Sequence, residues 1–151
     1  MIILITGSLY WVKEVLYLDK RKPKLTIMNT KTAAIVIGLI FLAVGLLGFV
    51  SNPIVGASHD AIFHTDKVHN IVHIVSGALF LLIAIAAPAS ASIFLKIFGI
   101  VYLGLGIYGM LTMGSAETQK LLGFLHVNKA DNYLHIGLGI VIFLAGTLRR
   151  P

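Results

Sequence analysis

The histidines are the chemically most versatile residues of the chain, and two of them anchor matching polar clusters. An imidazole can ligate a metal ion, pass a proton, or donate and accept hydrogen bonds. In each cluster a histidine stands four residues before a glycine, at His73/Gly77 and His135/Gly139, a spacing that places both on one helix face. His69 stands four residues before His73 and shares its face. Together the two clusters comprise His69, Asn70, His73, Asp131, Asn132 and His135.

Two kinds of role fit this polar layer, and we favour the structural one. In it, His69 or Asn70 caps one helix start, and Asp131 or Asn132 caps the other. His73 and His135 then each bond to an Asn or Asp of the other cluster, because polar side chains commonly join helices inside membranes. This hypothesis requires no cofactor and no catalytic residue.

The alternative role is a cofactor site in a small redox or metal-handling protein. His73 and His135 could ligate a b-type haem from its two faces. With His64 and His126 they could instead form a four-histidine copper or zinc site, since imidazole suits both metals. A proton path is less favoured, because the positive end of a helix dipole opposes the imidazolium form.

Other reactive groups are scarce. The chain has no cysteine, which excludes disulfides, thiolate catalysis and Cys-ligated zinc or iron–sulfur sites. No serine or carboxylate dyad stands beside a histidine at the same depth in both clusters, so we expect a protein that is not an enzyme. The formal net charge of +6 does not indicate nucleic acid, because the basic residues gather mainly at the chain ends.

The elements that must position these histidines are transmembrane helices. Hydrophobic residues make up 58% of the chain, its mean hydropathy is +0.94, and only 12% of its 151 residues are charged. Four apolar segments are each long enough to cross a hydrocarbon core of roughly 30 Å. They run over about 33–50, 68–87, 93–113 and 132–148. The predicted fold class is an all-α membrane protein.

The distribution of lysine and arginine predicts the orientation. One side receives the N-terminal basic cluster, Lys31, Lys96 and Arg149–Arg150, so both termini are predicted to be cytoplasmic in the cell membrane. Residues 1–31 are then a cytoplasmic or interfacial extension, 32–148 the transmembrane domain and 149–151 a cytoplasmic tail. The loops over about 51–67 and 114–130 lie outside.

The transmembrane domain reads as two tandem copies of a helix pair. Residues 38–48 align with 99–109 at an offset of 61, and residues 64–73 align with 126–135 at an offset of 62. In the second block His, Lys, Asn and His recur in the same order. We predict repeats over about 32–91 and 92–148, in one orientation and related by a pseudo-two-fold axis along the membrane normal.

Glycines recur on the first and third helices at spacings of seven and three. This spacing places them on one helix face, which favours close packing of helices in a membrane. The predicted partners of the chain are therefore the lipid bilayer and, as a candidate, further copies in a homo-oligomer. The packing glycines are Gly38, Gly45, Gly48, Gly99, Gly106 and Gly109.

The pattern Asn-x-x-His-x-x-x-Gly opening a helix, at residues 70–77 and 132–139, resembles a bacterial four-helix membrane family classed as a domain of unknown function. The stretches GLLGF at residues 45–49 and HVNKADNYLH at 126–135 are similar to elements typical of that family. The resemblance covers roughly residues 32–148 and excludes the N-terminal extension. It implies a four-helix membrane protein and no particular reaction.

Overall fold

Four long helices dominate the computed structural model, which describes residues 29–58 and 61–147. They are α2 (Thr30–Leu47), α3 (Lys67–Ala86), α4 (Ala91–Met113) and α5 (Lys129–Thr147). Windows of 18 residues in these spans have mean hydropathies of 2.2, 2.1, 1.8 and 1.2, the third span being counted from Pro88, and each is long and apolar enough to cross a membrane. The prediction of a multi-pass, four-helix membrane protein is confirmed. Most of the predicted extension, and the predicted tail, lie outside the described residues.

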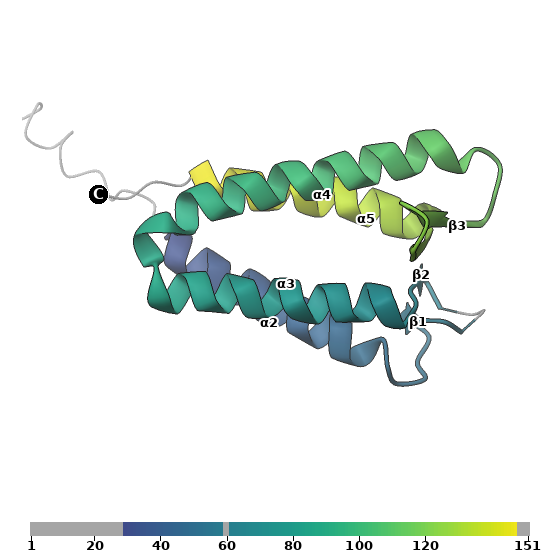
Figure 1. The fold of residues 1–151 in the computed structure, drawn as a ribbon, viewed down its shortest axis with the longest axis horizontal. Coiled ribbons are helices and arrows are strands. Elements are labelled where there is room, and N and C mark those ends of the chain that lie inside the picture. Colours follow the sequence, from purple (N-terminus) through teal and green to yellow (C-terminus); the bar gives the residue numbers. More distant parts are fainter. Residues whose placement is uncertain (1–28, 59–60, 148–151) are drawn as a thin grey trace, which may run out of the picture.

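The helices form two hairpins, α2–α3 and α4–α5, which run along the same long axis (Figure 1). A short 3-10 turn, η1 (Pro88–Ser90), joins α3 to α4. Helix α3 ends before it because Pro88 disfavours helical geometry at Ala87. We call this end of the bundle the turn end. The opposite end carries all the described strands, and we call it the strand end.

Two small sheets at the strand end were not predicted and add short strands to a mostly helical fold. Strands β1 (Val55–Gly56) and β2 (Phe63–His64) pair in parallel, while β3 (Thr118–Leu121) and β4 (Leu125–Asn128) form an antiparallel hairpin. The hairpin had a signal in the sequence. Apolar and polar residues alternate along β4, and Gly123, with φ of 84°, occupies the short loop.

The helix caps also differ from the prediction. Asp66 caps α3, its Oδ1 accepting a hydrogen bond from the His69 amide at 2.8 Å. At the start of α5, Asn128 Oδ1 accepts from the Asp131 amide and Asp131 Oδ2 accepts from the Asn128 amide, at 2.9 and 2.8 Å. Of the four candidate capping residues, only Asp131 takes part in a cap, as the reciprocal partner of Asn128 in this box.

Within each hairpin the helices approach most closely at glycines. A Cβ on Gly45 would lie 2.8 Å from the carbonyl oxygen of Asn70 on α3. A Cβ on Gly106 would lie 2.7 Å from the carbonyl oxygen of Asn132 on α5. The remaining predicted packing glycines also face the other helix of their own hairpin; these are Gly38, Gly48, Gly99 and Gly109.

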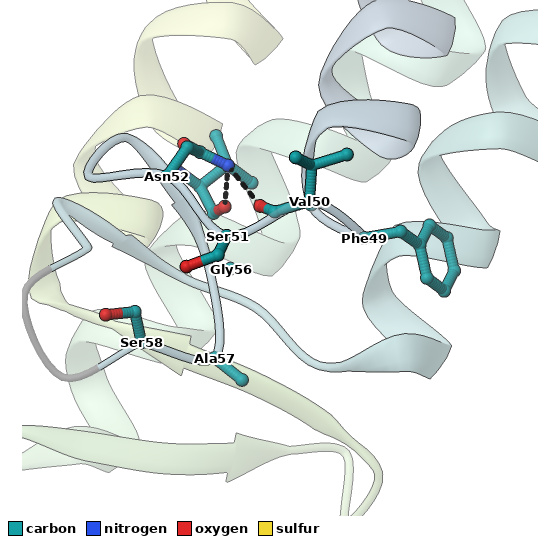
Figure 2. A pocket seen from close by; sticks show the side chains of 9 residues that line it. Phe49, Val50, Ser51, Asn52, Gly56, Ala57 and Ser58 are labelled. Carbon is teal, nitrogen blue, oxygen red and sulfur yellow. Dashed lines mark hydrogen bonds between the residues drawn. The ribbon is translucent and has the colours of Figure 1, made fainter.

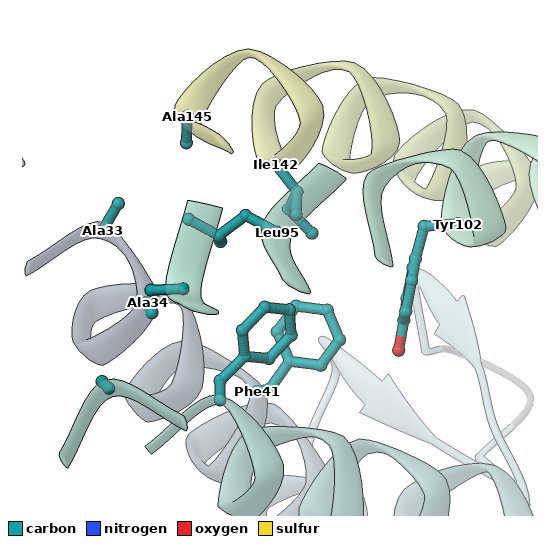
Figure 3. Packing of buried hydrophobic residues seen from close by; sticks show 10 residues of the cluster. Ala33, Ala34, Phe41, Leu95, Tyr102, Ile142 and Ala145 are labelled. Atoms are coloured by element: carbon teal, nitrogen blue, oxygen red, sulfur yellow. The ribbon is translucent and has the colours of Figure 1, made fainter. Parts of the chain in front are cut away.

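Between the hairpins, aromatic rings replace glycines as the contact. Phe41 of α2 lies 5.1 Å from Tyr102 of α4, and 5.6 Å from Phe80 of its own hairpin, measured between ring centroids. Phe98 of α4 lies 4.9 Å from Phe80. Figure 3 shows Phe41 and Tyr102 pointing into the space enclosed by the helices. The two hairpins are thus tight internally and are separated from each other by a layer of rings.

Substituting the packing glycines tests this arrangement. Gly45→Ala and Gly106→Ala should each lower the free energy of unfolding by about 1–3 kcal/mol, because the added methyl group meets backbone atoms that cannot move aside. Chemical unfolding in mixed detergent micelles, followed by circular dichroism, measures the change. Gly104→Ala is the matched control on α4, since its Cβ would meet nothing within 4 Å. Equal stability of the three variants would contradict the packing.

Candidate functional site

Three buried histidines converge at the strand end of the bundle. His69 and His73 lie one turn apart on α3, and His135 comes from the first turns of α5. Their side chains are only 2%, 8% and 5% exposed. One ligand atom from each imidazole lies within 4.8 Å of those of the other two. We call His69, His73 and His135 the histidine triad.

The geometry of the triad follows from the helices that carry it. The four-residue spacing places His69 and His73 on one face of α3, with ring centroids 4.6 Å apart. Helices α3 and α5 both start at the strand end, so His135 reaches a similar depth from the other hairpin. Its ring centroid lies 5.7 Å from that of His69 and 6.3 Å from that of His73.

One hydrogen bond fixes the protonation of His69. Its Nδ1 lies 2.8 Å from the carbonyl oxygen of His126 on β4. A carbonyl oxygen only accepts, so Nδ1 carries the proton and the neutral ring keeps a free lone pair on Nε2. This bond links α3 of the first hairpin to the strand that precedes α5.

The other two rings of the triad are not satisfied in this way. Nδ1 of His73 and Nδ1 of His135 are buried, and neither has a hydrogen-bond partner among the described residues. A buried polar atom without a partner costs about 1–3 kcal/mol. The triad therefore combines one imidazole held in a defined tautomer with two that are free to take a further partner.

Aromatic rings close the triad on the side of the bundle interior. Phe41 meets His73 edge-on at 5.5 Å, and Tyr102 meets His135 edge-on at 5.4 Å. The Tyr102 side chain in turn hydrogen-bonds that of Ser76 on α3. The aromatic rings that separate the hairpins therefore also contact the triad on its interior side.

A second contact between the hairpins involves Asp131. Its Oδ2 accepts a hydrogen bond from the backbone amide of His64 on β2 at 3.0 Å, in addition to the one from Asn128. Asn128 extends this contact, its side-chain amide donating to the carbonyl oxygen of Ile62 at 2.8 Å. Asp131 is 3% exposed, so its carboxylate belongs to the buried layer.

His64 and His126, predicted as further metal ligands, lie outside the triad. Their ring centroids are 6.3 Å apart, and together with Glu117 they line a separate cavity of about 380 Å³. The structure thus groups His69, rather than His64 and His126, with His73 and His135. Sequence spacing already placed His69 and His73 on one face, and that was the available signal for this grouping.

Asn70 and Asn132 pack within their own hairpins, which corrects the expected Asn–His bonds across the clusters. Oδ1 of Asn70 lies where a Cβ of Gly48 would be, and Oδ1 of Asn132 lies in the same way against Gly109. Neither oxygen accepts a conventional hydrogen bond among the described residues. Each instead faces a glycine Cα–H, which is a weak donor.

The cavity beside His73 is small for a b-type haem. The cavity beside His73 has a volume of about 140 Å³ and an apolar lining, including Val44 and Leu138. Sites for ligands of drug size usually have about 300–1,000 Å³. Phe41 and Tyr102 also occupy the space beside the two rings that a porphyrin would need.

A cavity of about 270 Å³ at the end of α2 offers little chemistry. Its polar centre is Asn52, whose side-chain nitrogen donates to the carbonyl oxygens of Val50 and Val55 at 2.6 and 2.9 Å (Figure 2). Its Oδ1 accepts from the amides of Ile54 and Val55. The Asn52 amide is therefore used in shaping the loop that follows α2.

Comparison with known proteins locates the chain in a family. No curated protein and no solved structure matches it. A family model described as "Domain of unknown function (DUF4383)" matches residues 31–148, a range that contains the triad and nearly all of the four helices. This confirms the resemblance to an uncharacterised membrane family that the repeated Asn-x-x-His pattern indicated. The chain belongs to the DUF4383 family of domains of unknown function.

Proposed function

We propose that this protein is a non-catalytic component of the cell membrane whose two helix hairpins are held together by a polar lock at the outer face. The lock consists of two contacts between the hairpins, His69 Nδ1 to the His126 carbonyl oxygen and the His64 amide to Asp131 Oδ2. The reciprocity of these two contacts is the observation that carries the proposal. Lipid offers no competing hydrogen-bond partners, so such contacts hold the hairpins in one arrangement.

The same contacts support the proposed tandem repeat. At the offset of 62, His69 corresponds to Asp131 and His64 corresponds to His126. The side chain at position 69 of the first repeat bonds the backbone of position 126 in the second repeat. The side chain at the equivalent position 131 of the second repeat bonds the backbone of position 64 in the first repeat. A pseudo-two-fold axis between the hairpins accounts for both contacts.

Equivalent glycine contacts support the repeat independently. Gly45 faces Asn70 and Ile74, and Gly106 faces Asn132 and Ile136. These residues correspond at the offsets found in the sequence, 61 for the glycines and 62 for their neighbours. In this proposal both hairpins have the same orientation, and both chain termini are cytoplasmic.

A non-catalytic role agrees with how the polar groups of the layer are used. Oδ2 of Asp131 accepts from two backbone amides and is held in a structural position. Ser76 is the hydroxyl residue on the face of α3 nearest the ring layer, and it bonds Tyr102. Self-association remains a prediction. The helices expose many large apolar side chains, and these could contact either lipid or another copy of the chain.

Cysteine labelling tests the orientation without background, because the chain has no cysteine. Ser115→Cys places an exposed thiol at the strand end, and Ala89→Cys places one at the turn end. A membrane-impermeant maleimide applied to intact cells should label Ser115→Cys, whereas Ala89→Cys should react only after lysis. The reverse pattern would overturn the proposed orientation.

Removing the acceptor of the lock should destabilise the bundle. Asp131→Leu leaves two partly buried amides without this acceptor, so the free energy of unfolding should fall by about 2–5 kcal/mol. Asp131→Asn retains an oxygen acceptor and should lose less. Unfolding in mixed micelles measures both variants, with exposed Glu117→Leu as the control. If Asp131→Leu is as stable as Glu117→Leu, the lock is not what holds the hairpins together.

A further inference from the structure

The polar lock does not account for the rest of the histidine triad. Five buried side-chain atoms lack a hydrogen-bond partner among the described residues, and two of them are Nδ1 of His73 and Nδ1 of His135. The oxygens of Asn70 and Asn132, two more of the five, meet glycine Cα–H groups. Unpaired nitrogens in a buried layer call for a ligand that they can bind.

We propose that His69, His73 and His135 bind a single copper ion in its Cu⁺ state. One ligand atom from each side chain lies within 4.8 Å of the others, a separation from which three imidazoles can converge on one ion. All three side chains are more than nine-tenths buried. The site draws on both hairpins, so the ion would join them at the centre of the polar layer.

His69 is already prepared as a ligand. Metal-binding histidines usually donate their second ring N–H to a carbonyl or carboxylate, which fixes the tautomer and aims the other nitrogen at the metal. The bond from His69 Nδ1 to the His126 carbonyl oxygen provides this support at 2.8 Å. The free lone pair is consequently on Nε2.

The other two ligands are free to adjust. Metal–imidazole bonds are about 2.0–2.1 Å long, so ligand atoms around one ion lie closer together than the widest separation in the triad. The rings must draw inward by roughly 1 Å. His73 and His135 have no hydrogen bond from Nδ1 to break, so small rotations of these two rings can close the site.

The charge of the site favours a monovalent ion. The energy of burying an ion rises steeply with its charge, and none of the three ligands is a carboxylate or thiolate that could neutralise a divalent ion. The starts of α3 and α5, the positive ends of two helix dipoles, lie at the same layer. Neutral imidazoles bind copper well, and Cu⁺ adds half the charge of Zn²⁺.

Copper loading of the purified full-length protein tests the assignment. The protein carries a tag free of histidine, is kept in detergent with ascorbate, receives Cu⁺ or Zn²⁺, and is desalted before elemental analysis. One equivalent of Cu⁺ should be retained against a chromophoric Cu⁺ chelator, and X-ray absorption should show nitrogen donors only. Preferential retention of Zn²⁺ would overturn the assignment to copper.

His73→Phe and His135→Phe are the test variants, because phenylalanine keeps the ring contacts with Phe41 and Tyr102. Each should weaken Cu⁺ retention at least about tenfold. Losing only a residue that supports a metal ligand already costs about 10–100-fold in metal affinity, and these variants remove a ligand itself. His64→Ala and His126→Ala are the matched controls outside the triad. Both should retain copper as the unchanged protein does, since the carbonyl of residue 126 remains.

The melting temperature of the metal-free protein separates a metal site from a purely structural layer. His73→Phe removes a buried nitrogen that has no partner, so the melting temperature without copper should not fall. Copper should raise the melting temperature of the unchanged protein and leave that of His73→Phe unaffected. Copper retention by both triad variants, or its loss in the His64→Ala and His126→Ala controls, would overturn the site.

Discussion

Polar groups buried away from water need hydrogen-bond partners within the protein, and this constraint shapes the strand end. The polar residues there must find partners within the bundle, and helices alone cannot supply them because their own backbone groups are already paired. The strands solve the problem. β4 presents the His126 carbonyl to His69, and β2 presents the His64 amide to Asp131. The small sheets are therefore the framework that lets a polar layer exist between the hairpins.

The contrast between the two kinds of helix contact follows from side-chain size. Inside each hairpin, glycines such as Gly45 and Gly106 allow backbone atoms of the facing helix to approach to within van der Waals range. Between hairpins, Phe41, Phe80 and Tyr102 keep the helices further apart. That wider separation leaves room at the strand end for imidazoles, which would not fit at a glycine contact.

The sequence predicted the parts that depend on local pattern. Apolar runs of membrane-spanning length located the four helices to within about three residues at every boundary. Helical spacing placed His69 and His73 on one face, as their ring contact bears out. The glycine spacing likewise selected positions that face a neighbouring helix.

The parts that depend on tertiary contact were not predictable in the same way. Asp66 and Asn128 cap α3 and α5, although both were read as loop residues, because helix starts are set by hydrogen bonds rather than by where hydropathy rises. The pairing of His69 with His126 joins residues 57 positions apart. No spacing rule within one helix reveals such a contact, so the grouping of the triad required the fold.

The two repeats carry the same residue at some positions of the polar layer and different residues at positions 69 and 131, which correspond. His73 and His135 correspond and are both histidine, whereas position 69 is histidine and its counterpart 131 is aspartate. A histidine at 131 could donate to a carbonyl but could not accept the two amides that Asp131 accepts. The aspartate therefore strengthens the lock on one side while leaving three imidazoles rather than four at the centre. Three ligands cannot be divided equally between two hairpins. In the proposed site the first hairpin therefore supplies two donors and the second supplies one, so the ion binds the first hairpin through more bonds than the second.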